Sequence, residues 1–181
     1  MQLDNDITEA INSFAGQFPA LDYAALFFAK IVIFILVASV AASWFIRAKY
    51  EELRFRAISC GLAVALGLLM NQVILLFVAR TRPYDLGLTH LIVEKSADPS
   101  FPSDHATVAF AIAFVLLFRR DRFAGLYMAL AIFVGLARIF IGTHFITDVL
   151  GGAVTALIAA VVVPYLYKSN SSLNKFLVRI L

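Results

Sequence analysis

Five apolar runs separated by short charged segments limit what this chain can fold into. Four of them are long enough, or nearly so, to cross a bilayer as helices: residues 23–46, 57–78, 123–141 and 148–167. A further run, residues 104–118, is shorter, but His105 at its start and Arg119 at its end mark it as a span with polar ends. With 62% hydrophobic residues, the chain is too apolar for a soluble domain of 181 residues. We therefore expect an all-α fold, a polytopic membrane helical bundle with five transmembrane spans.

The N-terminal segment differs from these runs. Residues 4–15 place Ile7, Ile11 and Phe14 on one face at helical spacing, which predicts a short helix lying on the membrane surface. The first apolar run is too long for a cleavable signal peptide, and no basic region precedes it. No repeat, linker or second domain is visible, so we expect residues 1–181 to form a single integral-membrane domain.

Basic residues gather on alternate loops. Ten of the fifteen Lys and Arg residues lie between the first two runs, between residues 118 and 123, or after the last run: Arg47, Lys49, Arg54, Arg56, Arg119, Arg120, Arg122, Lys168, Lys175 and Arg179. The first 22 residues contain acidic residues but no Lys or Arg. The positive-inside rule then predicts a cytoplasmic C-terminus, with the N-terminus, residues 79–103 and residues 142–147 outside. The net charge of +3 thus reflects a belt on the inner face and does not indicate a nucleic-acid partner.

The loops expected outside carry polar residues that could perform chemistry. They are Arg82, Ser103, His105, Arg138, His144 and Asp148. His144 and Asp148 are four residues apart and share a helix face, so the carboxylate could accept the Nδ1 proton and leave Nε2 free as a nucleophile or base. Two arginines can grip a tetrahedral oxyanion, and a hydroxyl and helix N-terminal amides can complete the cradle. Two histidines suit an in-line displacement, one attacking and one protonating the leaving oxygen.

Other interpretations of these residues remain open. Arg and His at span ends often anchor helices at the membrane interface, and His144 with Asp148 could simply tie two helices together. A transporter or structural membrane protein could bind lipid phosphate with the arginines and amides alone. His105, His144 and Asp148 could instead hold a metal ion, but the two arginines would repel a divalent cation, so we expect neither metal nor cofactor.

The motifs resemble the three-part signature of the type 2 phosphatidic acid phosphatase (PAP2) superfamily, which contains integral-membrane lipid phosphatases and soluble vanadium haloperoxidases. The three parts are Arg82-Pro83, Pro102-Ser103-Asp104-His105, and Arg138 through His144 to Asp148. The resemblance implies that His144 forms a phosphohistidine, that Asp148 orients it, and that His105 protonates the leaving oxygen. It also implies that Arg82, Ser103 and Arg138, with backbone amides near Asp104 and His105, bind phosphate.

The sequence departs from this family pattern at three positions. Leu75 stands where the family usually has a Lys, seven residues before Arg82, so Arg80 or Lys30 is expected to supply the missing cation to the substrate phosphate. Ala137 replaces a Ser that often precedes the arginine of the third part. Asp104 replaces the usual Gly, and the Pro-Ser-Asp-His variant is similar to bacterial undecaprenyl-diphosphate phosphatases of the bacitracin-resistance type.

The expected function follows from that similarity. We expect a metal-independent hydrolase of the bacterial inner membrane that removes the terminal phosphate of undecaprenyl diphosphate on the outer face. Phosphatidylglycerophosphate, phosphatidate and lipid A phosphates are the alternative substrates. The partners are then a lipid phosphate or diphosphate and the surrounding membrane lipids, and residues 84–100 could form a lid over the site.

Overall fold

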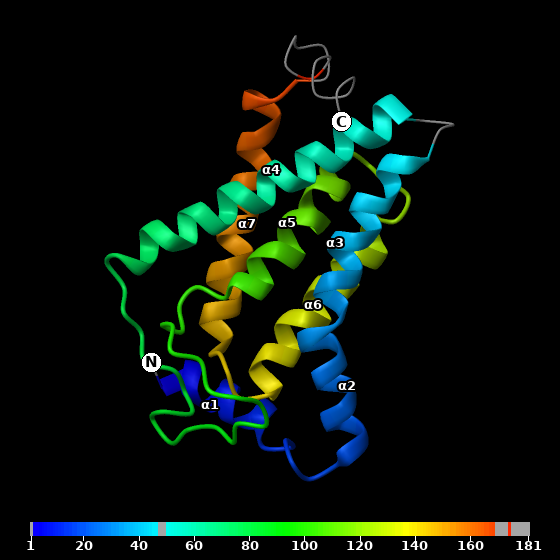
Figure 1. Cartoon of the computed structure of the whole chain (residues 1–181). Helices are drawn as coiled ribbons and strands as arrows, with labels where there is room; N and C mark the ends of the chain where they lie inside the picture. Colours follow the sequence, from blue (N-terminus) through cyan, green and yellow to red (C-terminus); the bar gives the residue numbers. More distant parts are fainter. Residues whose placement is uncertain (1, 47–49, 169–173, 175–181) are drawn as a thin grey trace.

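The computed structural model describes residues 2–46, 50–168 and 174 of the chain, and within them every regular element is a helix. In chain order the elements are α1 (Gln2–Asn12), α2 (Pro19–Lys30), α3 (Val32–Ala42), the 3-10 helix η1 (Ser43–Phe45), α4 (Tyr50–Leu75), α5 (Asp104–Phe118), α6 (Ala124–Phe140) and α7 (Ile146–Leu166) (Figure 1). Four of the basic residues used for the loop-charge argument, Arg47, Lys49, Lys175 and Arg179, lie outside the described residues.

The apolar runs predict these helices closely. The expected span 104–118 coincides with α5, and α6 and α7 begin and end within two residues of their expected bounds. Helix α4 begins earlier than expected, at Tyr50, and ends at Leu75. The first run is not one continuous helix, because the helix is interrupted at Ile31, between α2 and α3.

Three helical stretches of the described chain are long and apolar enough to cross a membrane: Pro19–Phe45, Glu51–Leu75 and Ile146–Leu166. Helices α5 and α6 are equally apolar in character but shorter, with 15 and 17 residues. The described fold is therefore all-helical, and three of its helical stretches reach the length of a membrane span without thinning of the bilayer.

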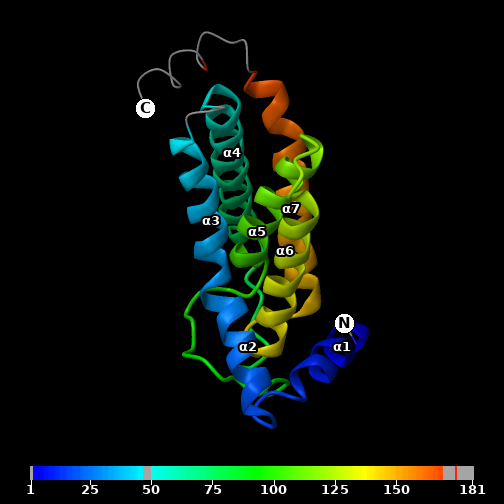
Figure 2. The same ribbon diagram turned by 90° about the vertical axis from the view of Figure 1, so that its right-hand side faces the viewer.

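Helix α5 occupies the middle of the bundle. It packs against α4, α6 and α7, and α3 also touches it (Figure 2). The core around it is rich in buried alanines, and small residues let neighbouring helices approach closely. A Cβ on Gly67 of α4 would lie only 2.8 Å from Thr107 Cγ2 of α5, and one on Gly135 of α6 would lie 2.7 Å from Val149 Cγ1 of α7.

The two ends of the bundle differ. One end collects α1, the loop of residues 76–103, the start of α5, the end of α6 and the start of α7 (Figure 1). The start of α4 and the loop between α5 and α6 lie at the other end, with the end of α7. The predicted active-site residues thus fall at one end, and the arginines of residues 119–122 fall at the opposite end.

Helix α1 is shorter than expected and packs differently. It ends at Asn12, so Phe14 lies beyond it and is exposed. The residues of α1 that are fully buried are polar, Thr8 and Asn12, and they face α6 and α7. Ile11 packs against a small cluster formed by Ala106, Ile139 and Val149. The polar face of α1, rather than only its apolar face, therefore contacts the protein.

Candidate active site

The loop that carries His144 is shaped by a glycine. Gly142 has a φ of 85°, a left-handed conformation that side chains rarely adopt, and a Cβ there would lie 2.6 Å from the His90 carbonyl oxygen. Thr143 closes the turn by donating its hydroxyl to the Arg138 carbonyl at 2.8 Å. Helix α7 then starts at Ile146, and Asp148 Oδ2 accepts the Phe145 N–H at 2.8 Å in the first turn. His144 and Asp148 are thus fixed relative to each other by the backbone.

The buried imidazole of His144 has its Nδ1 close to two acceptors. The Ser100 carbonyl oxygen lies 2.8 Å from Nδ1, and Asp148 Oδ2 lies 3.6 Å from it. A carbonyl oxygen can only accept, so the Nδ1 nitrogen carries the proton and Nε2 keeps its lone pair. The expected carboxylate contact is therefore present at long range, but the shorter hydrogen bond is to a backbone carbonyl that the sequence motif does not contain.

Burial lowers the pKa of His144 below the ordinary histidine value. The positive charges of Arg138 and Arg82 act in the same direction, whereas the hydrogen bond and charge of Asp148 oppose them. A lowered pKa keeps the imidazole neutral near neutral pH, which is the form that can act as a nucleophile.

Asp148 is completely buried and is held from three sides. Besides the Phe145 N–H, it accepts hydrogen bonds from the Ser100 hydroxyl and, at 2.6 Å, from Arg80 Nη1. Buried carboxylates need such partners, since an isolated buried charge is very costly. Ser100 therefore touches both members of the His144–Asp148 pair, one through its carbonyl and the other through its hydroxyl.

Arg80 contacts the start of α7 and α1. Its guanidinium donates to Thr147 Oγ1 at 2.6 Å and pairs with Asp4, and it stacks 3.8 Å from the centre of the Phe145 ring. These contacts use both terminal nitrogens. The described side-chain contacts of Arg80 are therefore with Asp148 and its neighbours Thr147, Asp4 and Phe145, and its phosphate contact stays a prediction.

Helix α1 carries three polar residues that hydrogen-bond on both sides of residues 141–145, the loop between α6 and α7 that carries His144 and is called the catalytic loop below. Asp4 accepts the Thr147 N–H at 3.1 Å, and Thr8 Oγ1 accepts the Ile146 N–H at 3.2 Å. Asn12 accepts the His90 N–H at 2.7 Å and donates to the carbonyls of His90 and Phe140. The three residues are spaced four apart and lie on one helix face. Their spacing was visible in the sequence, although nothing in it indicated what they would contact.

The second motif meets α7 directly. The Ser103 N–H donates to the Asp148 carbonyl at 3.0 Å, just before α5 begins. The Ser103 hydroxyl is buried and has no hydrogen-bond partner among the described residues, and the same holds for Arg138 Nε. His105, in the first turn of α5, interacts electrostatically with Arg138, His144 and Arg82, so the four side chains share one neighbourhood. The structure therefore brings together both histidines and both expected phosphate-binding arginines.

Arg82 is buried and largely occupied by backbone carbonyls. It donates from Nε to Asp98 O at 2.8 Å and from Nη1 to Thr143 O at 2.9 Å, with longer contacts from Nη2 to Ser96 and Pro99. These bonds tie the loop of residues 96–99 to the catalytic loop. A guanidinium has five N–H donors, so one Nη1 hydrogen remains for a substrate.

Asp104 points to α4. Its carboxylate accepts a hydrogen bond from Asn71 Nδ2 at 2.7 Å, and the same amide nitrogen lies 2.9 Å from Thr107 Oγ1. Asn71 is fully buried in residues 57–75 of α4, which are mostly apolar, a signal that sequence analysis could have used. Lys30, the other expected substitute cation, is exposed at the end of α2, and within the described part of the chain it forms no hydrogen bond or ion pair with these side chains.

The described residues include no group of three or more His, Cys, Asp and Glu side chains arranged to hold a metal ion. The acidic and imidazole groups of the site are instead paired with arginines, a serine and backbone groups.

Several known proteins resemble this chain. Undecaprenyl-diphosphatase BcrC of Bacillus subtilis (strain 168) is 30% identical over 156 residues, which cover 86% of this chain and 80% of that protein. A Bacillus licheniformis protein named bacitracin transport permease protein BcrC is 27% identical over 165 residues, or 90% of this chain and 79% of its own length.

The fold also has a solved counterpart. The transmembrane PAP2-type phosphatidylglycerolphosphate phosphatase from Bacillus subtilis superposes with a TM-score of 0.69 over 94% of this chain and 87% of that chain, at 22% identity. This likeness concerns the fold, and the three long apolar helical stretches indicate that the chain is an integral membrane protein. The sequence pattern of the PAP2 superfamily matches residues 56–172, which is more than half of the chain. The chain therefore belongs to the PAP2 superfamily of phosphatases.

Proposed function

We propose that this protein hydrolyses the terminal phosphate of undecaprenyl diphosphate through a phosphohistidine intermediate. One observation carries the catalytic part of the proposal. Two buried polar atoms, Ser103 Oγ and Arg138 Nε, have no hydrogen-bond partner in the described part of the chain. Ser103 lies two residues before His105 and bonds through its N–H to Asp148, and Arg138 lies near both His105 and His144. Unsatisfied buried groups are uncommon in folded proteins, and a bound phosphoryl group would satisfy both.

The mechanism follows from the roles of the side chains. Arg138 and the remaining N–H of Arg82 hold the terminal phosphoryl group, and Ser103 donates its hydroxyl to it. His144 Nε2 attacks the phosphorus while its Nδ1–H stays bound to the Ser100 carbonyl. The bond from phosphorus to the bridging oxygen breaks, and His105 gives that oxygen its proton. The lipid then leaves as a monophosphate.

A second displacement restores the enzyme. Water attacks the phosphorus, His105 takes its proton, and the bond from phosphorus to His144 Nε2 breaks to release inorganic phosphate. Fixed donors aimed at the developing charge are expected to contribute most of the acceleration, about 10²–10³ in rate for each donor. Neither displacement calls for a metal ion, because the arginines supply the positive charge.

The relatives guide the choice of substrate. The 30%-identical Bacillus subtilis protein bears the name undecaprenyl-diphosphatase, and it matches most of both chains. A terminal diphosphate also suits this site, because its leaving group is a phosphomonoester and requires less help from His105 than a lipid alkoxide would. Phosphatidylglycerophosphate, phosphatidate and lipid A phosphates are the competing substrates within the same family.

We also infer the topology that this function needs. In this proposal all of residues 1–181 form one domain that crosses the bacterial inner membrane five times, with α5 and α6 as the two short spans. The positive-inside rule places the arginines of residues 119–122 in the cytoplasm with the C-terminus. The N-terminus and the catalytic residues then face outward, where the spent lipid carrier would be met.

Phosphate release from purified protein tests the proposal. We expect turnover of undecaprenyl diphosphate to exceed that of phosphatidylglycerophosphate, phosphatidate and lipid A, to persist in EDTA, and to disappear in His144→Ala. Acid-labile, base-stable radiolabel on the protein after incubation with terminally labelled substrate would mark the phosphohistidine. Substantial turnover by a clean His144→Ala preparation would refute the scheme.

A second candidate is transport without hydrolysis, since the Bacillus licheniformis relative is named a transport permease. Binding a lipid phosphate needs the arginines and Ser103, but it does not need a buried imidazole with an oriented Nδ1 proton. The same assay separates the two functions. A transporter would bind undecaprenyl diphosphate without releasing phosphate, and His144→Ala would leave that binding intact.

A further inference from the structure

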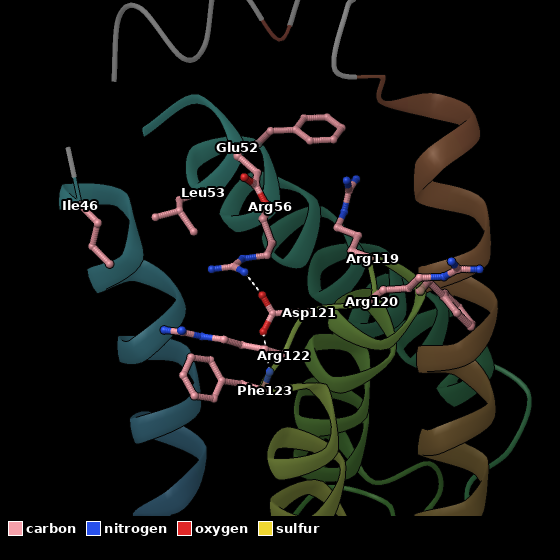
Figure 3. Close-up of a pocket in the computed structure, with 11 residues that line it drawn as sticks. Ile46, Glu52, Leu53, Arg56, Arg119, Arg120, Asp121, Arg122 and Phe123 are labelled. Carbon is pink, nitrogen blue, oxygen red and sulfur yellow. Dashed lines mark hydrogen bonds and ion pairs between the residues drawn. The ribbon is translucent and has the colours of Figure 1, made fainter. Parts of the chain in front are cut away.

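A cavity of ≈ 720 Å³ lies at the end of the bundle opposite the catalytic residues (Figure 3). The start of α4, the loop between α5 and α6, and Ile46 after η1 form its walls. Its charged lining residues are Arg56, Arg119, Arg120, Arg122, Glu52 and Asp121. Four guanidinium groups against two carboxylates leave this lining with an excess of positive charge. The catalytic mechanism uses none of these residues.

The positive charge is only partly neutralised. Arg56 pairs with Asp121 Oδ2, and Asp121 Oδ1 accepts the Phe123 N–H at 2.8 Å (Figure 3). Among the described residues, Arg120 and Arg122 form no ion pair with any carboxylate. Figure 3 shows the Arg56 and Arg122 side chains on either side of Asp121, both extending toward the blue helix that carries Ile46 near its end. Arg56 and Arg122 thus lie in the same region of the cavity, where Asp121 is the neighbouring carboxylate and pairs with Arg56.

The loop that carries these arginines is held in a defined shape. Arg119 donates to Ser59 Oγ at 3.0 Å and stacks 4.2 Å from the centre of the Phe55 ring, so its place beside α4 is fixed. Arg120 has a φ of 52°, a left-handed conformation that is uncommon for residues other than glycine. Arg122 stacks 4.5 Å from the Phe123 ring. Side chains held in this way lose less conformational entropy when they bind a ligand.

Apolar side chains adjoin the charged region. Ile46, Phe118 and Phe123 line the cavity and are each about half exposed. They lie at the ends of helices α5 and α6 and just after η1, where membrane-crossing helices would meet the lipid headgroups. The cavity therefore offers guanidinium groups beside an apolar wall, which matches the two chemical parts of an anionic phospholipid.

We propose that this cavity binds the headgroup of an anionic phospholipid, with its phosphate on Arg56 and Arg122 and its acyl chain along Ile46, Phe118 and Phe123. Guanidinium groups are planar donors that match phosphate oxygens bidentately. Basic pockets between helices at the cytoplasmic side are suited to such headgroups. A soluble anion would use the arginines but would gain nothing from the apolar wall. This site is separate from the active site and independent of the proposed hydrolysis.

The protein carries a suitable reporter for this site. Trp44 is the one tryptophan of the sequence, and it lies in η1, two residues before Ile46. The Arg54 guanidinium of α4 lies 4.7 Å from the centre of its ring, which places Trp44 at this end of the bundle. Brominated acyl chains quench tryptophan fluorescence at short range. The full chain, reconstituted in phosphatidylcholine bilayers, can therefore be titrated with brominated phosphatidylglycerol and, in parallel, with brominated phosphatidylcholine.

The expected result is tighter association of phosphatidylglycerol than of phosphatidylcholine, by about fivefold for each arginine engaged. Arg122→Gln should weaken that preference by about fivefold, and it should fold normally because Arg122 is exposed. Lys95→Gln is the matched control, because Lys95 lies in the loop at the other end and the same unit of charge is removed. We expect it to leave the preference unchanged.

Three outcomes of the lipid titrations alone would overturn the proposal. They are equal quenching by the two brominated lipids in the wild type, an unchanged preference in both Arg122→Gln and Arg56→Gln, or an equal loss of preference in Lys95→Gln. Competition with a soluble phosphate tests whether the cavity binds a lipid or a free phosphate. If phosphate or glycerol phosphate at high millimolar concentration abolishes the difference between the lipids, the cavity takes a free phosphate and the lipid assignment fails. Because the readout is fluorescence in the absence of substrate, failure here would leave the proposed hydrolysis untouched.

Discussion

Arg80 stands two residues before the first motif, yet its side-chain hydrogen bonds in the described structure go to Asp148, Thr147 and Asp4. It links Asp148 to Asp4 and Thr147 and covers the Phe145 ring. A residue that binds substrate phosphate and a residue that positions the catalytic pair affect kinetics differently. Loss of a phosphate ligand raises KM as well as lowering kcat, whereas loss of a positioning group lowers kcat with little change in KM.

We therefore predict that Arg80→Gln lowers kcat by about tenfold to a hundredfold while KM changes little. The size follows from a hydrogen bond to a charged group, about 1.5–3 kcal/mol. Steady-state phosphate release over a range of substrate concentrations measures both constants. Lys95→Gln, which removes a charge from the same loop without touching the site, should match the wild type. A rise in KM that accounts for most of the loss would return Arg80 to the role of phosphate ligand.

The lowered pKa of His144 predicts how the rate of phosphohistidine formation depends on pH. Since burial lowers its pKa, the imidazole becomes protonated, and loses its nucleophilic lone pair, only below the ordinary histidine pKa of about 6.5. The rate of phosphohistidine formation should therefore stay level from neutral pH down to about 6.5 and fall only at lower pH. Asp148 opposes the lowering, so Asp148→Asn should move this acid limb to still lower pH while reducing the plateau rate. Rapid-quench measurement of labelled protein against pH tests this; an acid limb above about 6.5 contradicts it.

At the level of the helix elements, the approach of α7 to the start of α5 depends on a glycine. A Cβ on Gly152 would lie 2.6 Å from the Ser103 carbonyl oxygen and 3.0 Å from Thr107 Oγ1. The first of these atoms belongs to the backbone, so it cannot move aside without moving the whole Pro-Ser-Asp-His segment.

Gly152→Ala should therefore displace Ser103 and His105 from the catalytic loop. We expect phosphate release to fall at least about tenfold and the thermal midpoint to drop, because forcing extra volume into a packed contact costs about 1–3 kcal/mol. Gly61→Ala on α4 is the control, because a Cβ there meets no atom within 4 Å. That variant should keep activity and gain slightly in helix stability. Equal behaviour of the two variants would show that the close approach is unimportant.

Helix α1 is attached to the catalytic loop by charge and should detach at low pH. Burial tends to raise the pKa of Asp4, but the hydrogen bonds from Arg80 and Thr147 outweigh it and hold the pKa below its ordinary value. A carboxylate whose folded pKa is depressed stabilises the folded state fully above its unfolded pKa, about 4, and that stabilisation is lost as the pH falls through the lower folded value.

Asp4→Asn should accordingly destabilise the protein by about 1 kcal/mol at neutral pH. The difference in thermal midpoint between the wild type and Asp4→Asn should shrink as the pH falls below about 4. Asp6→Asn is a suitable control, since Asp6 is exposed and bonds only to Gln2 in the described structure. A difference that is independent of pH would mean that Asp4 contributes through packing and not through its charge.

At the scale of the whole molecule, sequence patterns predict the elements better than their contacts. The apolar runs place α5, α6 and α7 within two residues of their ends, because a helix in lipid must satisfy its own backbone and its length follows from its apolar content. The three motifs likewise predict which side chains meet at one end of the bundle. The break at Ile31 was not predicted, since neither Pro nor Gly marks it.

The groups missed by sequence analysis share one property. Ser100, Asn71 and Asn12 act through hydrogen bonds to segments far away in the chain, and their residue types are common in loops and caps. Tertiary structure alone reveals such partners. The same explanation applies to the bonds of Arg80 with Asp148, Thr147 and Asp4, while its phosphate contact stays a prediction.

The proposed five-span topology can be tested through the two ends of the bundle. Helices α5 and α6 have 15 and 17 residues, so they extend about 22 and 25 Å, less than the roughly 30 Å of a bilayer core. Five crossings therefore require either a locally thinned bilayer or helix ends that lie below the lipid headgroups. Both alternatives keep the loop of residues 76–103 and the loop of residues 119–123 on opposite sides of the membrane.

Single cysteines report these sides directly. The natural Cys60 is buried and should be replaced first, as Cys60→Ala. In that background, Leu86→Cys should react with a membrane-impermeant maleimide added to intact spheroplasts, because Leu86 is exposed in the loop that the proposed topology places outside. Arg120→Cys, at an exposed position of the other loop, should react only after the membrane is permeabilised. Labelling of both cysteines from outside would place the two loops on the same face of the membrane. Because α5 connects these two loops, it could not then cross the membrane.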